Sequence, residues 1–172
     1  MENFIKLMLA FGIGLLLVLL AMPKVIPFLH KMKFGQVERE EGLESHKKKG
    51  GTPTMGGVVF VLAAVIAAFV VNYKNITNPN LILITIVLVG YSLIGFIDDA
   101  LIILKHQNEG LKAWQKFLMQ AILAVGCYLY LENFVPGFTT EVTIPIVKVN
   151  IDFGWFYAVL VFIMFTGESN GA

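Results

Sequence analysis

Long apolar runs alternate with short polar segments along the chain, and this pattern predicts its main elements. A membrane-spanning helix needs about 20 mostly apolar residues. Five segments meet or approach that length, so the pattern predicts one transmembrane domain over residues 1–172. The predicted spans lie near residues 4–26, 52–72, 76–98, 114–132 and 153–168.

The segment between the last two spans has a different pattern. Its sequence, FVPGFTTEVTIPIVKVNIDFG, alternates apolar and polar residues, which is typical of a short hairpin, and Pro145 should weaken one strand. The predicted fold class is therefore an all-α integral membrane protein. It has about five transmembrane helices and a short extracytoplasmic β-hairpin.

The distribution of lysine and arginine predicts the orientation of the spans. Ten of these residues fall in or beside the loops 27–51 and 99–113, and three lie on the opposite side. Basic residues favour the cytoplasmic side. We therefore expect an external N-terminus and a cytoplasmic C-terminus. Three polar clusters then share the cytoplasmic face: SHKKKGGTPTMGG, DDALIILKHQNEG and TGESNGA.

Composition agrees with membrane insertion and excludes other classes. The chain is 57% hydrophobic and 15% charged, with a mean hydropathy of +0.77, whereas a soluble domain is about 25% charged. A net charge of +1 gives no indication of a nucleic-acid partner. The single cysteine, Cys127, excludes an internal disulfide.

Two adjacent carboxylates, Asp98 and Asp99, end the third predicted span at about headgroup depth. Ionised side chains there usually mark a site or have a partner. Adjacent helical side chains diverge by about 100°, unless the helix ends at the pair. The two residues could hold a divalent cation, or one could act as a base. The alternative is a polar stop that fixes helix depth, but an adjacent pair favours function.

The cluster KKKGGTPTMGG predicts a phosphate-binding helix start. Thr52 is a good N-cap and Pro53 suits the first turn, so the second helix should begin here. A helix N-terminus favours phosphate. Lysines alone are more often a positive-inside signal or an anionic-lipid patch.

Gln115, Lys116 and Gln120 could face a polar cavity. Together these clusters indicate a membrane-surface enzyme acting on phosphate-bearing substrates, one of them a lipid.

Three stretches resemble a known family. FGQVEREEGLESHKKKGGTPTMGG looks like the first cytoplasmic signature of the phospho-N-acetylmuramoyl-pentapeptide transferases (MraY-type), in the polyprenyl-phosphate N-acetylhexosamine-1-phosphate transferase superfamily. GFIDDALIILKHQNEGLKAWQKF resembles the second signature, and TGESN the start of the third. The likeness runs from about residue 20 to the C-terminus.

The resemblance implies a reaction and its partners. Phospho-N-acetylmuramoyl-pentapeptide would pass from UDP-N-acetylmuramoyl-pentapeptide to undecaprenyl phosphate, giving lipid I and UMP in peptidoglycan synthesis, with Mg2+ as cofactor. The fold would be half of a ten-helix bundle. The protein would be a multi-pass homodimer, surrounded by membrane lipid in the bacterial inner (plasma) membrane, with its active site on the cytoplasmic face.

The resemblance also assigns roles by matched position. Asp98 and Asp99 match the catalytic pair that activates the lipid phosphate or supports the metal site. The remaining matched residues are implied to bind substrate: Lys49, Thr52, Thr54 and Asn170.

Two departures from the family pattern bear on activity. The pattern DDxxK would place lysine at position 102, where this chain has Ile102, and Lys105 could replace it only partly. The family also continues with an NLTDGLDG-like stretch, a further metal-binding aspartate and a histidine-rich loop. We therefore expect this chain alone to be inactive or nearly so, with the main metal ligand in the other half.

Two alternatives stay open at the level of sequence. One is a sister transferase that uses UDP-N-acetylglucosamine, which the choice of donor would separate. The other is a noncatalytic five-helix module that binds partner helices or anionic lipid. In that module, neutralising Asp98 and Asp99 would not change nucleotide-sugar binding, because there would be none.

Overall fold

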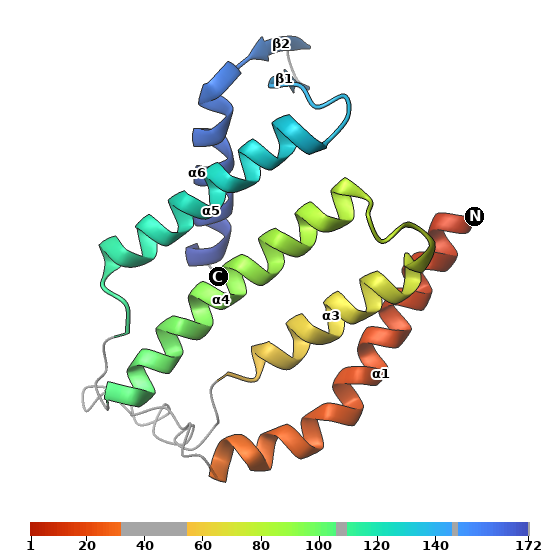
Figure 1. Cartoon of the computed structure of the whole chain (residues 1–172), viewed down its shortest axis with the longest axis vertical. Coiled ribbons are helices and arrows are strands. Elements are labelled where there is room, and N and C mark those ends of the chain that lie inside the picture. Colours follow the sequence, from red (N-terminus) through yellow and green to blue (C-terminus); the bar gives the residue numbers. More distant parts are fainter. Residues whose placement is uncertain (32–54, 106–109, 146–147, 172) are drawn as a thin grey trace. The chain divides into compact units, whose positions relative to one another are not determined.

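The computed structural model describes residues 1–31, 55–105, 110–145 and 148–171. Its helices and strands, drawn in Figure 1, are α1 (Glu2–Lys31), α3 (Gly57–Val71), α4 (Pro79–Lys105), α5 (Ala113–Phe134), β1 (Glu141–Ile144), β2 (Val149–Asp152) and α6 (Tyr157–Gly171). Short 3-10 helices, Tyr73–Asn75 and Gly154–Phe156, precede α4 and α6. The predicted all-α membrane class with a small β-hairpin is confirmed.

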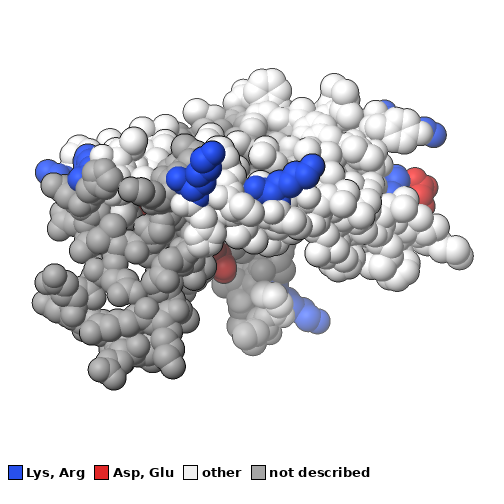
Figure 2. Space-filling model, turned by 90° about the horizontal axis from the view of Figure 1, so that it is seen from below, with Lys and Arg blue, Asp and Glu red and all other residues white. Residues whose placement is uncertain are grey.

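The helices expose the apolar surface that a lipid environment requires. Within the described ranges, α1, α4 and α5 are each long and apolar enough to cross a membrane, and α3 is a shorter apolar helix. Large side chains such as Phe11, Ile84 and Ile122 are about two-thirds exposed. Most of the described residues on the face shown in Figure 2 are uncharged. The chain is therefore a membrane protein, while five crossings and an extracytoplasmic hairpin stay predictions.

The chain divides into two compact units, which are described separately. The first holds residues 1–76 and 92–112, and the second holds 77–91 and 113–172. In the first unit, α1 packs antiparallel to α3 (Figure 1). Ala63 and Ala67 are buried in this unit, and a Cβ built on Gly14 would lie 3.8 Å from that of Ala67. Small residues allow membrane helices to approach this closely.

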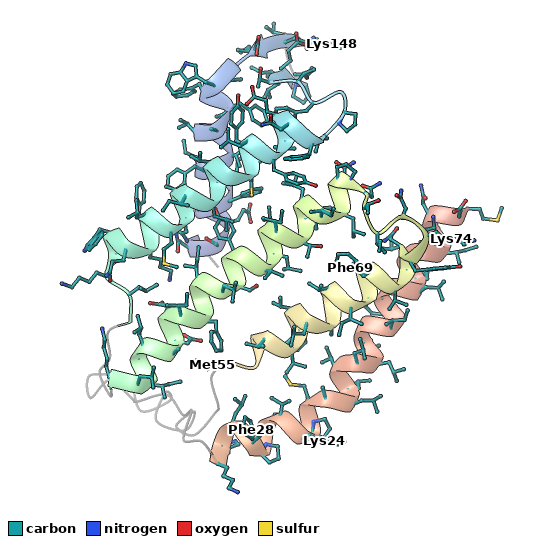
Figure 3. The ribbon with its side chains drawn as sticks, in the orientation of Figure 1. Lys24, Phe28, Met55, Phe69, Lys74 and Lys148 are labelled. Carbon is teal, nitrogen blue, oxygen red and sulfur yellow. The ribbon has the colours of Figure 1, made fainter. Side chains whose placement is uncertain are left out.

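Basic residues lie toward both ends of the α1–α3 pair. Figure 3 shows Lys24 on the C-terminal part of α1, at the same end of the pair as Met55, and Lys74 at the opposite end, just after α3. The topology predicted from the charge pattern requires the two ends of this antiparallel pair to face opposite sides of a membrane. The orientation itself stays a prediction.

Two expected helix boundaries differ from the structure. The helix α3 begins at Gly57, not at Thr52, because Met55 has a φ of 70° and so lies outside the right-handed helical region. The helix α4 does not end at Asp98 and Asp99, since it continues to Lys105. An apolar run indicates how much chain lies in lipid, but backbone hydrogen bonding extends a helix beyond it. The limits of the membrane spans stay predictions.

The second unit has its interior between α5 and α6. Ala124 and Cys127 on α5 are almost fully buried, and Val161 on α6 is 7% exposed. The rings of Phe117 and Phe162 meet edge to face, with centroids 4.9 Å apart. This geometry adds a favourable quadrupole interaction to the packing of the two helices.

The hairpin pairs β1 with β2 in antiparallel register, from Glu141 opposite Asp152 to Ile144 opposite Val149. Pro145 follows β1 instead of interrupting it, so both strands keep four residues. The hydroxyl of Thr143 donates across the ladder to Asn150 Oδ1 at 2.8 Å. Cross-strand pairs of this kind stabilise a two-stranded sheet.

Asp152 should titrate below the usual range of an aspartate. The Thr140 hydroxyl and then the Gly154 N–H donate to its carboxylate, which lowers its pKa. The resulting stabilisation is present above the ordinary pKa of an aspartate and is lost as pH falls through the folded value. Thr140→Val should raise the pKa, measured by NMR titration of the side-chain carboxyl carbon. Thr143→Val, which removes only the bond to Asn150, is the control. Equal shifts in both variants would contradict the assignment.

Candidate functional site

The Asp98 carboxylate on α4 is joined to the segment that precedes α5. Its Oδ1 atom accepts a hydrogen bond from the backbone N–H of Leu111, 13 residues along the chain, with an N···O distance of 2.7 Å. A charged acceptor makes such a bond stronger than one between neutral groups. Asp98 is half-buried. The contact therefore fixes the position of a carboxylate that the sequence marked as a site residue.

Gly110 allows this close approach. A Cβ built at Gly110 would overlap the Asp98 carboxylate and lie 2.7 Å from the Asp98 backbone oxygen. Rotation of the aspartate side chain cannot relieve an overlap with its own backbone. Sequence reasoning assigned no role to Gly110 or Leu111, and the one local signal was a glycine shortly before the next helix.

Asp99 lies one position further along the same helix and is also half-buried. Because α4 continues through both aspartates, their side chains leave the helix about 100° apart. Within the described ranges, no group of three or more His, Cys, Asp or Glu side chains could hold a metal ion. The described part of the chain therefore does not form a complete metal site. Asp98 and Asp99 could supply only part of one.

The position that the family pattern gives to lysine falls on the Asp98 side of α4. Ile102 and Lys105 follow Asp98 by four and seven residues within one continuous helix, so all three lie along one side of it. Ile102 is half-buried and Lys105 is exposed. An isoleucine can neither donate a hydrogen bond nor carry charge, whereas Lys105 has the right charge two turns away.

The second unit contains a polar cluster between α5 and α6. Gln120 is only 2% exposed, and its Nε2 lies 3.1 Å from Ser169 Oγ and 3.3 Å from Asn170 Oδ1. In return, Asn170 Nδ2 donates to Gln120 Oε1 at 3.1 Å. The sequence suggested that Gln120 faces a polar cavity, but its amide is paired with the residues of the TGESN stretch instead.

One helical turn before Asn170, a hydroxyl lies in the interior of this unit. The side-chain oxygens of Thr166 and Tyr91 are both buried, and the two hydroxyl groups interact with each other. The Tyr91 ring meets Phe165 edge to face, with centroids 5.8 Å apart. Sequence reasoning missed Tyr91, because a tyrosine in an apolar run gives no sign of where its hydroxyl lies.

Each unit brings one predicted site residue together with a partner. Asp98 lies with Gly110 and Leu111 in the first unit, and Asn170 with Gln120 in the second. The other predicted substrate-binding residues lie outside the described residues: Lys49, Thr52 and Thr54.

A family model and several known proteins that match this chain carry the same description. A family model described as phospho-N-acetylmuramoyl-pentapeptide-transferase signature 1 matches residues 49–61. The chain is 42% identical to the phospho-N-acetylmuramoyl-pentapeptide-transferase of Halalkalibacterium halodurans over 95% of its own length and 50% of that protein. For the protein of the same name from Bacillus subtilis the identity is 41%, over 91% of this chain and 48% of the relative.

These matches cover most of this chain but only about half of each relative. A third protein of that name, from Staphylococcus epidermidis, is 42% identical over 92% of this chain and 50% of its own length. The chain therefore spans about half the length of the curated relatives it matches. It is a relative of the phospho-N-acetylmuramoyl-pentapeptide-transferases and corresponds to the N-terminal half of their sequence.

Proposed function

We propose that this chain contributes to the transfer of phospho-N-acetylmuramoyl-pentapeptide from UDP-N-acetylmuramoyl-pentapeptide to undecaprenyl phosphate. The products are lipid I and UMP, an early step of peptidoglycan synthesis. The observation that carries the proposal is the 42% identity to transferases of that name over 95% of the chain. The signature at residues 49–61 supports the same assignment.

The reaction exchanges one phosphorus–oxygen bond for another. An oxygen of undecaprenyl phosphate bonds to the phosphorus that carries the sugar, and the bond from that phosphorus to the UMP oxygen breaks. Asp98 and Asp99 are the proposed catalytic pair, taking a proton from the lipid phosphate or orienting it. The fixed position of the Asp98 carboxylate on Leu111 supports a defined geometry for this step. The proposed substrate-binding residues are Lys49, Thr52, Thr54 and Asn170.

Mg2+ belongs to the proposal as the cofactor, because phosphate transfer from a nucleotide sugar develops negative charge that a divalent cation would neutralise. Mg2+ prefers six oxygen ligands in a near-octahedral arrangement. Asp98 and Asp99 are the candidate oxygen donors, but the described residues do not complete a site.

We place the protein in the bacterial inner membrane as a multi-pass homodimer, with its active site on the cytoplasmic face. The bias of basic residues toward the two predicted cytoplasmic loops supports this orientation. The apolar surfaces of α1, α4 and α5 support contact with membrane lipid.

Release of UMP tests the proposal. The purified chain would be assayed in detergent with Mg2+ and undecaprenyl phosphate, alone and joined to the half of the Bacillus subtilis relative that it does not match. We expect little release from the chain alone, and release from UDP-N-acetylmuramoyl-pentapeptide by the joined protein. EDTA should abolish that release, and Ile102→Lys should increase it, because a lysine one turn from Asp98 can contact phosphate.

The alternatives predict different results in the same assay. Release from UDP-N-acetylglucosamine instead would assign the chain to a sister transferase. No release from either donor by the joined protein, with or without Ile102→Lys, would contradict the proposed function. It would favour a noncatalytic membrane module.

A further inference from the structure

The amide of Gln120 is an unusual feature of an apolar helix pair. It is 2% exposed on α5, in the same interior as Ala124 and Cys127. Burying an amide without hydrogen bonds is unfavourable, because the group loses its bonds to water. Ser169 and Asn170 at the end of α6 supply those bonds. The pairing therefore ties the last turn of α6 to α5.

The reciprocal bonds also hold the Asn170 amide in one orientation relative to that of Gln120. Gln120 Nε2 donates to Asn170 Oδ1, and Asn170 Nδ2 donates to Gln120 Oε1. Turning the Asn170 amide by 180° would place donor against donor and acceptor against acceptor. An amide has two N–H donors and two acceptor lone pairs. Asn170 thus keeps one N–H and one lone pair that Gln120 does not use, in a defined orientation.

Asn170 itself is exposed, while the residue that orients it is buried. We propose that Gln120 is a positioning residue that holds the Asn170 amide ready to bind the nucleotide-sugar substrate, an inference that rests on the proposed function. The N–H left over on Asn170 suits a phosphate or carbonyl oxygen, and the lone pair suits a hydroxyl or imide N–H. A nucleotide sugar carries both kinds of group. Gln120 touches no substrate and acts through Asn170.

Kinetics of the joined protein test this role. Gln120→Met keeps the length of the side chain and removes all its hydrogen bonds to α6. It should raise the KM for UDP-N-acetylmuramoyl-pentapeptide about tenfold, leaving kcat and the KM for undecaprenyl phosphate within about twofold. In an Asn170→Ala background, Gln120→Met should add nothing. The exchange Gln120→Asn with Asn170→Gln, which preserves the amide pair, should recover part of the lost affinity.

Cys127→Ala is the matched control, because Cys127 is a buried residue of the same helix, 1% exposed. It should lower thermal stability without changing the KM for the nucleotide sugar. An equal rise in KM for Cys127→Ala would mean that general packing, not Gln120, controls affinity. An undiminished effect of Gln120→Met in the Asn170→Ala background would likewise overturn the inference.

A second measurement on the chain alone separates this inference from the proposed function. In NMR spectra, the two side-chain amide protons of Asn170 are assigned by their loss in Asn170→Ala. Their chemical shifts should change and move closer together in Gln120→Met but not in Cys127→Ala. Unchanged signals in Gln120→Met would show that Gln120 does not orient Asn170 and would overturn the inference. Absence of UMP release by the unsubstituted joined protein would instead contradict the proposed function, and the NMR result would still decide whether the amide is oriented.

Discussion

Replacing Asp98 by asparagine is expected to lower UMP release by the joined protein about 100-fold or more while leaving the fold intact. Asparagine keeps a side-chain oxygen that can accept the Leu111 N–H, so the contact at 2.7 Å can persist. It loses the negative charge and the ability to take a proton, and general-base catalysis contributes about 10²–10⁴-fold. Asp99→Asn should have an effect of similar size. Initial rates with UDP-N-acetylmuramoyl-pentapeptide measure both.

Asp98→Ala separates the chemical role of the carboxylate from its structural one. Alanine removes the acceptor as well as the charge, and an unpartnered backbone N–H destabilises a protein by about 1–3 kcal/mol if it stays buried. Asp98→Ala should therefore unfold at a lower temperature than Asp98→Asn, with equally low activity. Asp152→Asn, which changes an exposed carboxylate in the hairpin, is the control and should leave UMP release unchanged. Full activity in Asp98→Asn would contradict the catalytic role.

Replacing Gly110 by alanine is the second change from which we expect a large effect. The new methyl group would overlap the Asp98 carboxylate and lie 2.7 Å from the Asp98 backbone oxygen. The chain before α5 must then move away from α4, and the bond from Leu111 is lost or lengthened. Overpacking of this kind destabilises a protein by about 1–3 kcal/mol. UMP release should fall with it, and thermal unfolding together with initial rates measures the two effects.

Gly95→Ala provides a matched control one turn before Asp98. A Cβ at Gly95 meets nothing within 4 Å, so the substitution adds the same methyl group to α4 without overlap. Alanine in place of a helical glycine should be neutral or slightly stabilising, by up to about 1 kcal/mol. Combining Gly110→Ala with Asp98→Ala removes the overlap with the side chain but keeps the one with the backbone oxygen. If Gly110→Ala unfolded and reacted like Gly95→Ala, the close contact would have no role.

Several features of the fold could be predicted because they depend on local sequence. The length of an apolar run indicates how much chain lipid can surround, and helix formation satisfies the backbone within the same segment. The alternation of apolar and polar residues is also a local signal, and it predicted the β1–β2 hairpin. Boundaries were less predictable. The helix α4 passes through Asp98 and Asp99, and α3 starts after Met55, because hydrogen bonding and φ angles set these limits.

The candidate site depended more on tertiary structure. The sequence alone determined which residue types were present, and it marked Asp98, Asp99 and Asn170 as chemically significant. Only the fold decided that Leu111 donates to Asp98 across 13 residues, and that Gln120 pairs with Asn170 across 50. Hydrogen bonds between elements depend on the path of the chain in three dimensions. Periodicity along the sequence describes one element at a time, so it cannot identify the partner that a polar side chain finds on another.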